Sequence, residues 1–298
     1  MVSVQHAVKR FDQIVAVDNV SLKASPGEIF GLIGPNGAGK STIIKIIINI
    51  IQPDSGTVDF AGRRMIESDK ERIGYLPEER GLYRSVRVGE MLTYLADLKG
   101  KRPRDSAPVI DGWLERFDLM NWKHRKISEL SKGMAQKVQF IGAIAHEPEV
   151  LIFDEPFSGL DPVSSDLLLG SIQELARQGR TVLFSTHIME QAERICSKIL
   201  LINHGKEIIS GTVAKVRERY GSNSVIVEFD GNIDFVRGLP FVSNAMISPR
   251  WAEIELAEPG SHGRLYEALA GKVLVRRFEL VSPTLHRIFV QLVGEGAE

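Results

Sequence analysis

Cysteine and long hydrophobic runs are almost absent from this sequence of 298 residues. Its single cysteine, Cys196, cannot form an internal disulfide or a cysteine-rich metal site, which fits a reducing compartment. The most apolar stretch, residues 43–51, is interrupted by Lys45 and Asn49 and has about half the length of a membrane span. We therefore expect that the chain does not cross a membrane and that, if it works at one, a partner supplies the spanning helices.

An excess of charge is also lacking, since 37 Lys and Arg residues stand against 38 Asp and Glu residues. A broad nucleic-acid-binding surface would show a strong basic bias, so we expect no nucleic acid among the partners. Hydrophobic residues make up 43% of the chain and charged residues 25%, as in ordinary globular proteins, and the length predicts about two domains.

The pattern of apolar and polar residues changes twice along the chain. Around residues 84–130 helical periodicity dominates, which predicts an insertion of two or more helices. After about residue 215, alternating strands and two helices predict a small α+β domain. We therefore predict a domain over 1–215, with its helical subdomain over about 84–130, and an accessory domain over 216–298. The predicted strands span residues 15–22, 28–33, 57–60, 150–153, 181–185, 224–229, 252–256 and 273–280, with a hairpin over 199–209, and the predicted helices span 41–51, 88–98, 109–119, 129–145, 163–178, 189–196, 263–270 and 282–293.

A glycine-rich loop stands between the predicted strand 28–33 and the predicted helix 41–51, and it matches the pattern G-x-x-x-x-G-K-[ST]. Its glycines allow the backbone to wrap tightly with N–H groups pointing at an anion, and the helix N-terminus adds positive potential. Lys40 can reach the β- and γ-phosphates, and Ser41 can hold Mg²⁺. The pattern predicts that nucleotide phosphates bind to Gly34, Pro35, Asn36, Gly37, Ala38, Gly39, Lys40, Ser41 and Thr42.

Two adjacent acids, Asp154 and Glu155, follow the apolar run that predicts a buried parallel strand over 150–153. Ligand chemistry in parallel sheets gathers at this carboxyl end. One carboxylate can hold Mg²⁺ through water, and the next can accept a proton from an attacking water. Neighbouring strand residues point to opposite faces, so both acids can serve one site only because the strand ends there.

Together with three further segments, these motifs resemble the ATP-binding subunits of ABC transporters over roughly residues 2–220. The further segments are Leu130-Ser131-Lys132-Gly133-Met134, Ser158-Gly159-Leu160-Asp161 and the histidine His187, all in family order. The resemblance implies an α/β fold of the P-loop NTPase class, with a RecA-like core, an antiparallel β subdomain and a helical subdomain, followed here by the small C-terminal α+β domain.

The resemblance also implies roles for individual residues. Ser131 and Gly133 resemble the signature motif, which caps the γ-phosphate of ATP bound to the other subunit of a dimer. Asp161 resembles the D-loop acid that links the two sites, and His187 resembles the switch histidine at the γ-phosphate. Phe11 resembles the aromatic residue that stacks on adenine, with a core phenylalanine as the alternative interpretation.

The sequence departs from the family pattern at three positions. Lys132 and Met134 replace the first glycine and the glutamine of the signature motif. The glutamine that the family has after the strand-like segment 73–77 is replaced by an acid, and either Glu78 or Glu79 fills its place. A carboxylate at Glu78 could reach Mg²⁺ or water, but it adds negative charge next to the phosphates.

Segment 73–83, the signature and the tail 282–289 resemble a narrower group, the ATPase subunits of bacterial two-component exporters, including the sodium-efflux type. This resemblance implies a homodimer that binds two ATP–Mg²⁺ and hydrolyses them with Glu155 and His187. It also implies a membrane-spanning permease docked near residues 78–88 and the helical insertion, and a cytoplasmic location on the inner face of the membrane. The alternatives are a soluble ABC ATPase acting on ribosomes or nucleic acid, and a binding-only regulator that has lost hydrolysis.

Overall fold

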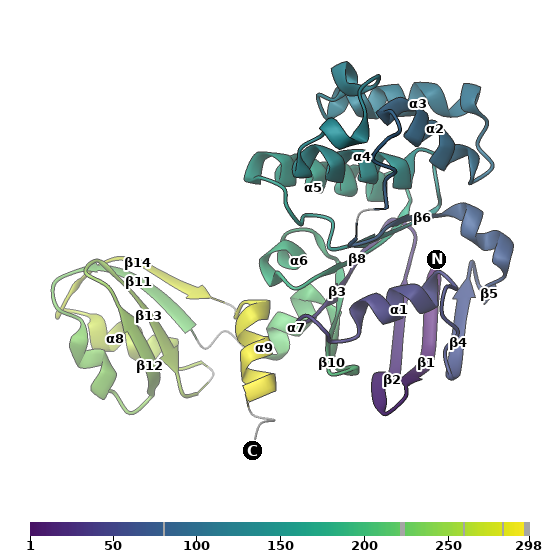
Figure 1. Ribbon diagram of the computed structural model, residues 1–298. Coiled ribbons are helices and arrows are strands. Elements are labelled where there is room, and N and C mark those ends of the chain that lie inside the picture. The colour runs from purple at the N-terminus through teal and green to yellow at the C-terminus, as the bar shows by residue number, and fades with distance from the viewer. Residues whose placement is uncertain (80, 221–223, 259, 282, 295–298) are drawn as a thin grey trace. The chain divides into compact units, whose positions relative to one another are not determined.

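Figure 1 shows a computed structural model of the chain, which describes residues 1–79, 81–220, 224–258, 260–281 and 283–294. The chain forms two compact units, Met1–Gly211 and Thr212–Glu298. Among the described helices, none is both long enough and apolar enough to cross a membrane.

A six-stranded sheet forms the centre of the first unit, in the order β10-β9-β3-β8-β7-β6. The five strands from β9 to β6 are parallel neighbours, so their carboxyl ends meet at one edge of the sheet. All residues of β3, β7 and β8 are buried, which explains why apolar residues form most of β3 and β7 and the centre of β8. The strands are β3 (Ile29–Ile33), β6 (Ile73–Leu76), β7 (Val150–Asp154), β8 (Thr181–Thr186), β9 (Lys198–Asn203) and β10 (Lys206–Thr212).

A four-stranded antiparallel sheet, in the order β2-β1-β4-β5, shares a hydrophobic core with the central sheet and with α1 (Lys40–Ile47). The helix predicted over 41–51 ends earlier, because Asn49 adopts a left-handed φ of 57° and the following N–H groups turn back to Lys45 O. Strand β1 was not predicted. The strands are β1 (Val2–Phe11), β2 (Ile14–Ala24), β4 (Ser55–Phe60) and β5 (Arg63–Arg64).

The helical segment packs α2 (Val88–Asp97) and α3 (Pro103–Arg116) against α4 (Lys132–Ile144), as Figure 1 shows. Helix α3 starts at Pro103 and not at the predicted residue 109, and Pro103 occupies a first-turn position that tolerates proline. Edge-to-face contacts join Phe140 of α4 to the ring of Phe117. Helices α5 (Pro162–Arg177) and α6 (Met189–Ile195) complete the unit, with short 3-10 turns at Glu67–Arg72, Met120–Trp122 and Ile127–Glu129.

The second unit is an antiparallel sheet in the order β12-β13-β11-β14, with α8 packed into the core on one of its faces. The sequence analysis did not predict β12 and α7. The helix predicted from 282 begins at a residue outside the described ranges, and the observed helix starts at Leu285. The elements are α7 (Val213–Arg219), β11 (Ser224–Asp230), the 3-10 turn Asp234–Gly238, β12 (Val242–Ile247), β13 (Trp251–Leu256), α8 (His262–Leu269), β14 (Leu274–Val281) and α9 (Leu285–Gly294).

Candidate functional site

The glycine-rich loop joins the end of β3 to the start of α1, and its geometry requires glycine. Gly37 and Gly39 have φ of 79° and 105°, in the left-handed region that other residues rarely adopt. A Cβ atom at Gly34 would lie 2.2 Å from Ile202 O, and one at Gly39 would lie 2.3 Å from Ala16 O. The loop therefore fits tightly against neighbouring backbone and leads into the N-terminus of α1, where backbone N–H groups favour an anion.

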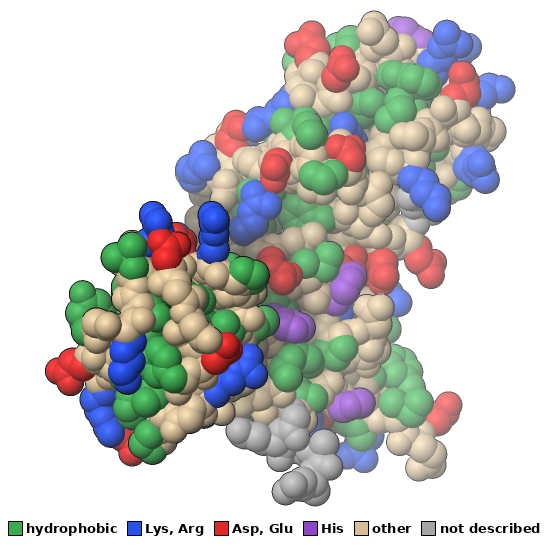
Figure 2. Space-filling view, turned by 90° about the vertical axis from the view of Figure 1, so that its left-hand side faces the viewer, with side chains coloured by type: hydrophobic (Ala, Val, Ile, Leu, Met, Phe, Trp, Pro, Cys, Tyr) green, Lys and Arg blue, Asp and Glu red, His purple; other side chains and the backbone are tan. Residues whose placement is uncertain are grey.

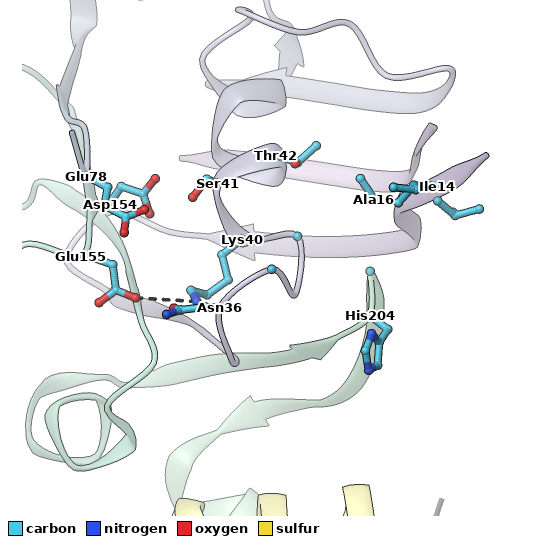
Figure 3. A pocket seen from close by; sticks show the side chains of 14 residues that line it. Ile14, Ala16, Asn36, Lys40, Ser41, Thr42, Glu78, Asp154, Glu155 and His204 are labelled. Atoms are coloured by element: carbon cyan, nitrogen blue, oxygen red, sulfur yellow. Dashed lines mark ion pairs between the residues drawn. The ribbon is translucent and has the colours of Figure 1, made fainter. Parts of the chain in front are cut away.

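Lys40, the first residue of α1, has a buried side chain that lies inside the loop. Its Nζ donates to Gly34 O at 2.7 Å and to Pro35 O at 3.1 Å. The same Nζ lies 3.7 Å from Glu155 Oε1, an ion pair that Figure 3 marks with a dashed line. The lysine ammonium is thus held where the loop and the acidic end of β7 meet.

The acidic pair lies at the end of β7, and both side chains are buried. Glu155 has a left-handed φ of 49°, and its Oε1 lies 3.0 Å from His187 Nδ1, just after β8. The same carboxylate oxygen therefore contacts both Lys40 and the histidine. The structure brings three of the residues singled out in the sequence into direct contact.

Glu78 follows β6 and lines the same cavity, whereas Glu79 is not among the described residues that line it. Figure 3 shows the carboxylates of Glu78 and Asp154 side by side, on the side of the cavity that carries Ser41. Burial raises the pKa of the nearby Tyr75 to about 12, with smaller contributions from the negative charges of Asp154 and Glu78. The oxygen atoms of this wall are the donor type that Mg²⁺ prefers.

The cavity has a volume of about 480 Å³, the size of a small-molecule site. Its polar end carries the loop and the acids, and its other end is formed by the start of β2 and the turn between β9 and β10. The lining residues are Ile14, Val15, Ala16, Asn36, Gly37, Gly39, Lys40, Ser41, Thr42, Glu78, Asp154, Glu155, His204 and Gly205.

Phe11 does not line this cavity: its side chain is 44% exposed and it faces Ile14 across the β1–β2 hairpin. The structure instead places His204 at the apolar end, as Figure 3 shows. The sequence analysis missed His204 and Ile14. Backbone hydrogen bonds join Gly205 to the glycine-rich loop and to β2, and they bring the β9–β10 hairpin to the cavity. No local sequence pattern predicts such contacts.

The signature-like and D-loop-like residues lie outside the cavity and cap helices. Ser131 is the N-cap of α4 and its Oγ accepts from Met134 N at 3.2 Å. Asp161 is the N-cap of α5 and accepts from Ser164 N at 2.9 Å, and hydrogen bonds from Ser164 hold its pKa below the usual range. A Cβ atom at Gly133 would make only ordinary contacts, so packing inside the chain does not require glycine there.

Two buried glutamines connect α4 to both acidic segments. Gln136 Nε2 donates to Pro156 O at 3.0 Å, directly after Glu155. Gln139 Nε2 donates at 3.2 Å to Pro77 O and to the backbone oxygen of residue 79, which flank Glu78. The helix behind the signature-like segment is therefore bonded to the backbone that carries two of the cavity's carboxylates.

Comparison with known proteins agrees with this architecture. Residues 17–158 match the family described as "ABC transporter", and residues 211–293 match "ATP-binding protein DrrA1-3-like, C-terminal domain". The chain is 37% identical, over 99% of both proteins, to the "Uncharacterized ABC transporter ATP-binding protein YhaQ" of Bacillus subtilis. It is 35% identical over 70% of its length to the "Nod factor export ATP-binding protein I" of Burkholderia thailandensis, of which it covers 69%.

A solved structure described as the "ATP binding subunit of ABC transporter" superposes on this chain with a TM-score of 0.69 and 31% identity, covering 74% of this chain and 93% of that one. The family resemblance, the fold class and the ATPase activity predicted from the sequence are thereby confirmed. The chain belongs to the ATP-binding proteins of the ABC transporter family and is an ATPase.

Proposed function

We propose that this ATPase powers a separate membrane-spanning permease and that the pair works as an exporter. The likeness to an export ATP-binding protein supports export. The permease would dock near residues 78–88, next to the segment bonded to α4 through Gln139. The chain would then act in the cytoplasm, bound peripherally to the inner face of the membrane.

The observation that carries the proposed chemistry is the meeting of Lys40 and His187 at one oxygen of Glu155. In this proposal the loop N–H groups and Lys40 bind the β- and γ-phosphates of ATP. Glu155 accepts the proton of the attacking water as general base, and His187 orients the γ-phosphate. ADP and phosphate are the products.

The oxygen atoms of Ser41, Asp154 and Glu78 fit a Mg²⁺ site that is completed by phosphate oxygens. No group of three or more His, Cys, Asp and Glu side chains able to hold a metal occurs among the described residues. The bound ion would offset the charge that develops on the phosphates.

We propose that two copies share the two ATP sites. Ser131 and Gly133 lie outside the chain's own cavity, and the N-terminus of α4 is a site that favours an anion. A second copy could therefore present its phosphate to them, with Asp161 close to the junction. On the face shown in Figure 2, Lys and Arg side chains are interspersed with Asp and Glu, and the described residues there form no continuous basic surface for nucleic acid.

Two experiments test the proposal. Glu155→Gln should lower kcat at least about 100-fold while ATP binding persists, because a general base contributes about 10²–10⁴-fold. Purification of the chain from its native membranes, with and without ATP, should recover a protein with several membrane spans. Recovery of ribosomal proteins or nucleic acid without such a partner would contradict the transport role, and undiminished hydrolysis by Glu155→Gln would contradict the assigned chemistry.

A further inference from the structure

Asp154 and Glu155 are consecutive residues, yet both side chains line one cavity (Figure 3). Side chains of consecutive strand residues normally point to opposite faces of the sheet. A local device must therefore turn the chain between these two residues. The contacts at the end of the neighbouring strand β8 identify that device as a serine hydroxyl.

Ser185 lies directly beside Asp154 in the parallel register of β7 and β8. The backbone N–H of Glu155 donates to Ser185 Oγ at 3.1 Å and also approaches Ser185 O at 3.3 Å. These bonds hold Glu155 in its left-handed conformation, with φ of 49°, a region that few residues other than glycine adopt. The turn that carries the Glu155 side chain into the cavity is thus fastened to Ser185.

The same hydroxyl also holds the other acid, because Ser185 Oγ donates to Asp154 Oδ1. A hydroxyl has one proton to donate and lone pairs to accept, so it can satisfy both bonds at once. Ser185 is fully buried and Asp154 is 2% exposed, so water does not replace these bonds. With Oδ1 engaged in this way, the orientation of the Asp154 carboxylate is fixed.

Ser185 is a buried polar residue near the end of β8, between the buried apolar Phe184 and the buried Thr186. A buried hydroxyl is unfavourable unless its hydrogen bonds are made. Both of its bonds go to the acidic pair. The serine is therefore explained by the site and not by packing of the strand.

We propose that Ser185 is a positioning residue for ATP hydrolysis: one hydroxyl orients the carboxylate that would hold Mg²⁺ and fixes the turn that aims the general base. This inference rests on the roles proposed above for Asp154 and Glu155. Ser185 would act through these two residues, since it is not among the described residues that line the cavity. Loss of the Ser185 hydroxyl should lower turnover and should lower the gain in nucleotide affinity that Mg²⁺ provides, while metal-free nucleotide binding by the loop is retained.

The test compares Ser185→Ala and the similarly sized Ser185→Cys with Ser171→Ala. Ser171 is a matched control, because it is also fully buried and its hydroxyl bonds to Leu167 O at 2.8 Å in α5. Both Ser185 variants should lower kcat about 10- to 100-fold with less than a threefold change in KM, since small misplacements of catalytic groups have effects of that size. Calorimetric titration should also show a smaller gain in nucleotide affinity when Mg²⁺ is added, whereas Ser171→Ala should change neither quantity.

Thermal unfolding should shift similarly for the alanine variants of both serines, which separates positioning from general loss of stability. Ser185→Thr keeps the hydroxyl and should recover most of the lost turnover. Turnover and Mg²⁺ response of Ser185→Ala equal to those of Ser171→Ala would overturn the inference. If Glu155→Gln abolishes hydrolysis in the same assay, that result leaves the proposed function intact, whereas full activity of Glu155→Gln would overturn both.

Discussion

The buried histidine His146, two residues after the end of α4, should make the stability of the first unit sensitive to acid. Its side chain is 8% exposed, and neither ring nitrogen has a hydrogen-bond partner among the described residues. The pKa of His146 is lowered from 6.5 to about 4, mainly by burial and to a smaller extent by the positive charges of Lys99, Arg180 and Lys101, against an opposing contact with the backbone of Ile73. The folded state therefore keeps this ring neutral under conditions in which the unfolded chain protonates it.

The size of the effect follows from the two pKa values. Above pH 6.5 the ring is neutral in both states, so the folded state is not penalised. As the pH falls from 6.5 towards 4, the unfolded state binds more protons and the free energy of unfolding decreases. At about 1.4 kcal/mol per pKa unit the full loss is about 3 kcal/mol, of which about 2 kcal/mol should be present at pH 5.

Urea unfolding of the wild type and of His146→Leu at pH 7.5 and pH 5.0, followed by tryptophan fluorescence, measures this loss. Trp113 packs against Phe117 and Phe140 in the same unit and reports on its core. His146→Leu should lose about 2 kcal/mol less than the wild type between the two pH values. His124→Leu, at an exposed histidine, is the control and should behave as the wild type. An equal loss for wild type and His146→Leu would refute the reasoning.

Three further predictions concern nucleotide binding and coupling. His204→Ala should raise the KM for ATP severalfold, because the His204 ring lines the cavity, and an unchanged KM would contradict a role of His204 in nucleotide binding. The same measurement on Phe11→Ala tests the stacking on adenine that the family resemblance implies. Gln139→Leu leaves the carbonyls around Glu78 unpaired and should raise the Mg²⁺ concentration needed for half-maximal hydrolysis severalfold, with an unchanged requirement as the contrary result. Replacing residues 81–84 by a flexible linker should abolish transport in reconstituted vesicles while basal hydrolysis persists, and parallel loss of both activities would exclude docking there.

The sequence predicts those parts of the molecule whose pattern is local. The strands ending at Asp154 and Thr186 were predicted because both are buried on two faces and contain a continuous apolar run, residues 150–153 and 182–184. The loop before Lys40 was predicted because its glycines are each required by a φ value or a close approach. By contrast, the register shifts between Val4 and Ala7 break the alternation of β1, so its signal was lost.

The apolar end of the cavity could not be predicted, because it depends on contacts between distant segments. Gly205 N donates to Ala38 O at 2.9 Å, and Asp18 N donates to Gly205 O at 2.8 Å. These bonds place His204 beside the loop, although the turn that contains it looks like any hairpin turn in the sequence. Ser185 escaped notice for the same reason, since its two partners lie on another strand 30 and 31 residues away.

The acid at Glu78 gains a physical explanation from its surroundings. Among the described residues that line the cavity, Glu78, Asp154 and Glu155 place three carboxylates around the ammonium of Lys40. These acids repel a phosphate that binds next to them, and a bound cation would offset that repulsion. A glutamine at position 78 would bind an ion through a neutral oxygen, whereas a glutamate there would make nucleotide binding depend more strongly on a divalent ion. With Mg²⁺ bound as proposed above, the glutamate would strengthen the coupling between metal and nucleotide and would keep an oxygen ligand in the wall of the site.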